Sequence, residues 1–176
     1  MIENYFIRLE GTLENCKTNV VHEKFAAGGS RVPVSLYELF HEYKGHTIEL
    51  VYELGNHNLA RVEVNLGAAR VPLFLITNKS HFSRLFSSKG NILKVECKHP
   101  RFKKYLEEIL ISTGLEQIAR DNLFEPRIET KTEKNEVKII TGFYLGFEDK
   151  IGTILPLLDF YKQIIDYRYW QAIETS

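Results

Sequence analysis

The stretch of residues 36–77 constrains the fold most, because it holds four apolar, strand-like runs separated by three short turns. The clearest run, residues 60–66, alternates apolar side chains with Arg61, Glu63 and Asn65. Successive side chains of a β-strand point to opposite faces, so this alternation predicts a strand with one buried and one wet face. Short turns between consecutive strands favour antiparallel neighbours. The stretch therefore predicts a β-meander.

The other three runs of the meander extend this pattern. Residues 36–43 and 46–54 flank a Lys-Gly pair of the kind that closes a hairpin, and residues 71–77 form the last run. This last run is apolar on both faces, which predicts a central strand or one that a helix covers. We expect the closing helices to cover it most deeply.

Three further strands are expected beyond the meander. Residues 91–97 predict a fifth strand. Residues 127–132 and 137–144 predict a hairpin that carries many charges. We expect this hairpin at an edge of the sheet, because charges at an edge discourage pairing with other chains.

Apolar residues recur at three- and four-residue steps in three segments, which predict helices at residues 2–16, 100–113 and 150–172. A shorter helix is expected at residues 115–122. The connections at residues 26–30 and 78–90 are rich in glycine or polar residues, and the second has room for one helical turn. Runs of strands and helices in this order indicate an α+β fold, an antiparallel β-meander sheet with helices packed on one face.

The chain is expected to form a single α+β domain spanning residues 1–176, because no repeat or low-complexity tract divides it. Lys and Arg together number 23, as do Asp and Glu, so no bulk positive charge attracts nucleic acid or anionic lipid. No signal peptide or transmembrane segment is predicted, and the two cysteines are expected to be reduced thiols. These features favour a cytoplasmic protein.

Two pairs of residues suggest metal or thiol chemistry. His41 and His46 are five residues apart, a spacing that does not place two ligands on one helix face, so we expect solvent-facing histidines and no metal site. Cys97 and His99 would share one side of a strand and could favour a thiolate. The alternative is a cysteine that ends an apolar strand as a small hydrophobic residue. No third group accompanies the pair, so we predict no catalytic residue and no cofactor.

Basic side chains gather before and within the start of the helix predicted at residues 100–113. A basic helix start with free N–H groups could hold a phosphate or a carboxylate, and it is the best sequence lead for a ligand. The alternative is a solvated face that Glu107 and Glu108 balance one turn later. The predicted anion-binding residues are Lys98, Arg101, Lys103 and Lys104.

Aromatic residues are frequent near the end of the last predicted helix. Tyr167 and Trp170 fall away from its main apolar face. Tyr and Trp are enriched at protein interfaces, so these two residues predict a surface for self-association or a protein partner. The alternative is that they belong to the core.

The segment Tyr43-Lys-Gly-His-Thr-Ile-Glu-Leu-Val-Tyr52, the strands that follow it, the His99-Pro-Arg-Phe102 helix start and the final hairpin and helix resemble a family of uncharacterised bacterial domains of unknown function. The resemblance covers about residues 36–165 and supplies no catalytic residue.

The functional hypothesis is a non-catalytic cytoplasmic domain that binds a partner protein, a second copy of itself or a small ligand. One alternative is a small enzyme or carrier with a pocket between the sheet and the last helix. Another is anion or nucleic-acid binding through residues 94–104.

Overall fold

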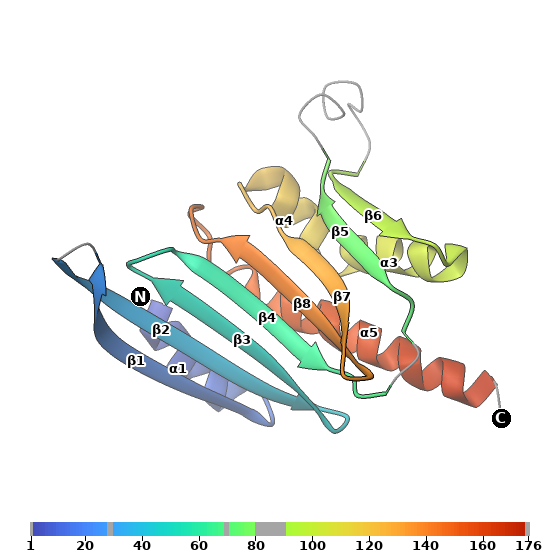
Figure 1. The fold of residues 1–176 in the computed structure, drawn as a ribbon, viewed down its shortest axis with the longest axis horizontal. Coiled ribbons are helices and arrows are strands. Elements are labelled where there is room, and N and C mark those ends of the chain that lie inside the picture. Colours follow the sequence, from blue (N-terminus) through green and yellow to red (C-terminus); the bar gives the residue numbers. More distant parts are fainter. Residues whose placement is uncertain (1, 28–29, 69–70, 80–90, 175–176) are drawn as a thin grey trace.

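An eight-stranded antiparallel sheet carries the described helices on one of its faces (Figure 1). The computed structural model describes residues 2–27, 30–68, 71–79 and 91–174. The fold class is α+β, as predicted. The helices are α1 (Ile2–Thr12), α3 (Pro100–Ser112), α4 (Leu115–Asp121) and α5 (Ile154–Glu174). The strands are β1 (Cys16–Ala27), β2 (Ser30–Tyr43), β3 (His46–Leu54), β4 (Leu59–Asn65), β5 (Phe74–Asn78), β6 (Leu93–Cys97), β7 (Arg127–Glu133) and β8 (Glu136–Tyr144).

The sheet follows chain order only through its first four strands. Its order is β1-β2-β3-β4-β8-β7-β5-β6. Strand β4 has the predicted two faces, since Val62 and Val64 are fully buried and Arg61 is exposed. Strand β5, which we expected to follow β4 as the end of the meander, pairs instead with β6 and β7.

The β7–β8 hairpin lies inside the sheet, so the prediction that it forms an edge is wrong. Strand β8 pairs with β4, and β7 continues the sheet to β5. The inner face of the hairpin is apolar, because Ile128 and Ile139 are fully buried there. Its charges point to the outer face, which the helices leave open (Figure 1). A central strand can carry charges on a face that water covers.

Strand β1 was not predicted. The first helix ends at Thr12 instead of residue 16, and β1 then pairs with β2 from Cys16 to Ala27. As an edge strand, β1 has mixed polarity on both faces, which hides the period of two. The break expected at residues 26–30 includes residues 28 and 29, which lie outside the described residues. Most of the connection at residues 78–90 also lies outside them.

Helix α5 packs on the inner face of the sheet through side chains that are almost completely buried. Its residues Phe160, Ile164 and Ile165 are at most 1% exposed. The hydroxyl of Tyr161 donates to the carbonyl oxygen of Val62, 2.9 Å away. Buried polar groups require such partners, so these contacts fix the position of α5 against the sheet.

His41 is buried, which contradicts the expectation that it faces solvent. It is 6% exposed and lies on the inner face of β2, opposite Cys16 of β1. Neither ring nitrogen has a hydrogen-bond partner among the described residues. The ring stacks on Tyr43. His46 is half-buried, and its Nδ1 lies 2.9 Å from the carbonyl oxygen of Asn65.

Candidate functional site

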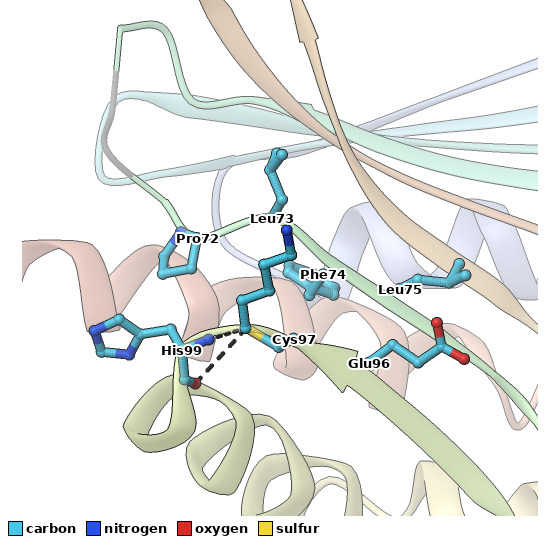
Figure 2. Close-up of a pocket in the computed structure, with 8 residues that line it drawn as sticks. Pro72, Leu73, Phe74, Leu75, Glu96, Cys97 and His99 are labelled. Atoms are coloured by element: carbon cyan, nitrogen blue, oxygen red, sulfur yellow. Dashed lines mark hydrogen bonds between the residues drawn. The ribbon is translucent and has the colours of Figure 1, made fainter.

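A cleft of about 770 Å³ opens where β5 begins and β6 ends (Figure 2). Most of its wall is apolar, and a few polar groups stand at its rim. This combination is typical of small-molecule sites, whose volumes are commonly about 300–1,000 Å³. The residues that line it are Pro72, Leu73, Phe74, Leu75, Glu96, Cys97, Lys98 and His99.

The apolar wall exists because β5 leaves its neighbour at this point. Strand β5 pairs with β7 only through Leu75 and Ile76. At Phe74 the hydroxyl of Thr130 replaces the strand ladder: it accepts from the Phe74 N–H at 2.8 Å and lies 3.4 Å from the Phe74 carbonyl oxygen. Pro72 has no N–H with which to extend the pairing.

As a result, Leu73 projects into solvent and is 63% exposed. The sequence predicted a central strand or one that a helix covers, and the structure leaves the outer face of this segment open at Leu73. The helices cover only the inner face, where Phe74 and Ile76 are buried. Leu73 therefore gives the cleft an exposed apolar side chain.

The opposite wall is the link between β6 and α3. The Sγ atom of Cys97 accepts from the His99 N–H at 3.4 Å and lies 3.7 Å from the His99 carbonyl oxygen. The ring of His99 caps α3, because its Nδ1 accepts from the Phe102 N–H at 3.3 Å. An accepting Nδ1 places the ring hydrogen of the neutral form on Nε2.

This arrangement does not join Cys97 and His99 as nucleophile and base. Figure 2 shows the His99 ring directed away from the Cys97 sulfur, and only the His99 backbone contacts that sulfur. A catalytic thiol needs a base within hydrogen-bond reach of its sulfur. Within the described residues, no group of three or more His, Cys, Asp or Glu side chains could hold a metal ion.

The structure separates the predicted anion-binding residues. Lys98 lines the cleft, and no ion pair joins it to a described residue. Lys103 and Lys104 lie on α3, where they face Glu107 and Glu108 at 3.9 and 3.8 Å. Arg101 is an exposed residue of the same helix.

The start of α3 offers fewer free donors than the sequence suggested. Pro100 has no N–H, and the N–H of Phe102 is bonded to the His99 ring. The N–H of Lys103 donates to the His99 carbonyl oxygen at 2.9 Å. An anion would therefore depend on side-chain cations more than on the helix end.

Of the predicted interface residues, Tyr167 is half-buried against α3. Its ring centre lies 4.8 Å from that of Phe102 and 4.6 Å from that of Tyr105. The side chain of Trp170 lies outside the described residues. The interface remains a prediction.

Sequence reasoning found Lys98 but missed the apolar wall beside it. Pro72 was the available signal, because a proline just before an apolar run marks the place where strand pairing stops. The strand with which β5 stops pairing at this point is β7. Local sequence patterns could not identify β7, because its position depends on the order of the strands in the sheet.

Comparison of the chain with models of known families, with curated protein sequences and with solved structures found no match. The resemblance to bacterial domains therefore stays a prediction. Among the described helices, none combines the length and the apolar character needed to cross a membrane.

Proposed function

We propose that this chain is a non-catalytic ligand-binding domain, and that its cleft takes a small molecule with an apolar body and one carboxylate. The observation that carries the proposal is the position of Leu73, largely exposed in a cleft whose rim holds Lys98. The apolar body would cover the leucine, and the carboxylate would meet the lysine.

The expected affinity is modest. Burying a leucine side chain contributes about 1.5–3 kcal/mol. A hydrogen bond to a charged group adds about 1.5–3 kcal/mol. Even before the loss of translational and rotational freedom, a total of about 3–6 kcal/mol corresponds to dissociation constants between about 40 μM and 6 mM, so we expect millimolar or weaker binding.

Three features support a binding role over catalysis. The His99 ring caps a helix, and the Cys97 sulfur is held by local backbone groups. The carboxylate of Glu96 is 2.6 Å from the Lys94 ammonium group, and this contact lowers the pKa of Glu96. A general acid near neutral pH needs the opposite shift.

The alternatives have less support. A carrier pocket between the sheet and α5 would need space that Phe160, Tyr161 and Ile165 occupy. Nucleic-acid binding would use Lys103 and Lys104, which already face carboxylates. Cys16 and Cys97 lie on β1 and β6 at opposite edges of the sheet, where they cannot form a disulfide with each other, so a cytoplasmic location stays a prediction.

The test is a titration of the ¹⁵N-labelled protein with octanoate, followed by NMR. We expect amide shifts at residues 73–75 and 96–98. Lys98→Gln should weaken binding about tenfold and Leu73→Ser about as much, because each removes one of the two contacts. Octanamide, which has the same chain without the charge, should bind the natural protein as weakly as octanoate binds Lys98→Gln.

Lys104→Gln is the matched control, because it removes the same charge from α3 outside the cleft. It should leave octanoate affinity within about twofold. The proposal fails if octanoate does not shift the cleft residues, or if the affinity is the same in the Leu73 and Lys98 variants as in the natural protein.

A further inference from the structure

The outer face of the sheet carries two arginines on either side of a glycine. In the strand register, Gly142 of β8 lies opposite Arg61 of β4 and opposite Arg127 of β7. Directly opposed residues of antiparallel strands point to the same face. Neighbouring strands are about 4.8 Å apart, so the two arginine Cα atoms are separated by roughly 10 Å.

Neither backbone conformation nor packing requires glycine at this position. Gly142 is absent from the residues with positive φ, and a Cβ atom built on it meets no other atom within 4 Å. Glycine inside a strand costs about 0.5–1 kcal/mol relative to alanine. Such a glycine often marks a place where a ligand or another backbone approaches closely.

Gly142 lines a notch of about 450 Å³ on the outer face. Tyr144, which is 71% exposed, and Leu59, which is 37% exposed, form its apolar side. Arg61 and Arg127 form its cationic sides. The notch shares no lining residue with the cleft at Leu73.

Each arginine is held by a glutamate two positions along its own strand. Arg61 bonds to Glu63, and Nη2 of Arg127 donates to Glu129 at 2.6 Å. A guanidinium group carries five N–H donors, so donors remain on both arginines. The glutamates hold the two guanidinium groups in place, which lowers the conformational entropy that these side chains lose when a ligand binds.

The net charge of the notch is close to zero, because Glu125 and Glu129 line it together with the two arginines. Lys138 and Lys131 offset part of the acidic charge, at 3.8 Å from Glu63 and 3.3 Å from Glu129. Long-range attraction is therefore weak, and binding must come from short contacts. A ligand that also covers Tyr144 has an advantage over a bare ion.

We propose that the notch over Gly142 binds a small aromatic phosphate monoester. Its phosphate would lie above Gly142 and accept hydrogen bonds from both arginines. Three terminal oxygens on a tetrahedral group can accept from two separate guanidinium forks, whereas a planar carboxylate matches one. Its aromatic ring would lie against Tyr144 and Leu59.

Phenyl phosphate is the probe, with binding followed by NMR at the Gly142 amide. We expect Arg61→Gln and Arg127→Gln each to weaken binding about tenfold. Benzoate and inorganic phosphate should each bind at least about tenfold more weakly than phenyl phosphate, because each lacks one half of the contacts.

Gly142→Ala separates the notch from the charges around it. It leaves every charge in place, its Cβ meets no other atom, and its melting temperature should equal or exceed that of the natural protein. It should nevertheless weaken phenyl phosphate binding at least about fivefold. Lys98→Gln, in the cleft, should leave this affinity unchanged.

Three results would overturn the proposal. The first is no binding of phenyl phosphate at millimolar concentration. The second is binding that survives both arginine substitutions, and the third is binding that Gly142→Ala leaves unchanged. None of them bears on octanoate in the cleft, so the two proposals fail separately.

Discussion

The hydroxyl group of Tyr161 in α5 lies between two buried polar groups of the sheet: it donates to the carbonyl oxygen of Val62 at 2.9 Å and accepts from the hydroxyl group of Thr141 at 2.8 Å. Tyr161→Phe removes this hydroxyl and leaves both partners buried. A buried polar group without a partner costs about 1–3 kcal/mol, so we expect a loss of that size in the free energy of unfolding. Urea denaturation measures it. A change below about 0.5 kcal/mol would show that the bond adds nothing to stability.

The same residue makes the fold sensitive to alkali. Burial raises the pKa of Tyr161 and of Tyr52 far above the usual value. Above about pH 10 the unfolded chain ionises these tyrosines, whereas the folded chain keeps them protonated. The folded state then binds more protons, so its stability falls as the pH rises. Tyr161→Phe should therefore reduce the fall in the free energy of unfolding between pH 9 and 11, and an equal fall in the variant and the natural protein would contradict this assignment.

Buried His41 should make the fold sensitive to mild acid. Burial first, and then the ammonium group of Lys162, lower the pKa of His41, while Glu42 and Asp159 oppose this shift. Below about pH 6.5 the unfolded chain takes up a proton that the folded chain resists, so stability is complete above that pH and is lost as the pH falls.

His41→Leu is the variant that tests this acid sensitivity. Urea denaturation at pH 7 and pH 5 should show a larger loss for the natural protein than for His41→Leu. Both proteins contain the same acidic side chains, so subtracting one loss in unfolding free energy from the other removes the contribution of those side chains. An equal loss in both proteins would show that the pKa of His41 is the same in the folded and the unfolded chain.

Two glutamates oppose each other on the outer face. Glu49 of β3 lies directly opposite Glu63 of β4, and like charges in this position destabilise a sheet by about 0.2–1 kcal/mol. We expect Glu49→Lys to raise the free energy of unfolding by an amount in that range. Salt near 1 M shortens the Debye length to about 3 Å and should remove most of the gain. A gain that high salt does not reduce would point to another cause.

Gly55 and Gly142 should respond to alanine in opposite ways. Gly55 has φ of +115°, and a Cβ atom there would lie 2.1 Å from the carbonyl oxygen of Pro33. Gly55→Ala should therefore destabilise by more than about 1 kcal/mol, whereas Gly142→Ala should stabilise by about 0.5–1 kcal/mol. Thermal denaturation of the two variants measures both effects. A destabilised Gly142→Ala would mean that the glycine has a structural role.

Local sequence patterns predicted where the strands and helices lie better than they predicted which strands pair with each other. Strand β4 and helix α3 were evident, because burial on one face forces a regular period in the sequence. Strand β1 was missed because an edge strand exposed to water can hold polar residues on both faces. The position of the β7–β8 hairpin depends on pairing between segments distant in the chain, and no local period records that pairing.

The candidate sites also differ in whether local sequence or strand pairing forms them. Lys98 was predicted from a run of cations in the sequence. The exposure of Leu73 and the pairing of Gly142 with two arginines depend on which strands are adjacent. They became apparent only from the sheet order.

The insertion of β7 and β8 between β4 and β5 sets the sequence in which the sheet can assemble during synthesis. Strands β1 to β4 pair with one another in chain order, so these pairings can form as soon as the four strands leave the ribosome. The open edge of β4 then has no partner until Glu136–Tyr144 has been made. For that interval the nascent chain exposes a strand that can pair with a neighbouring copy, and its dependence on chaperones should be greatest there.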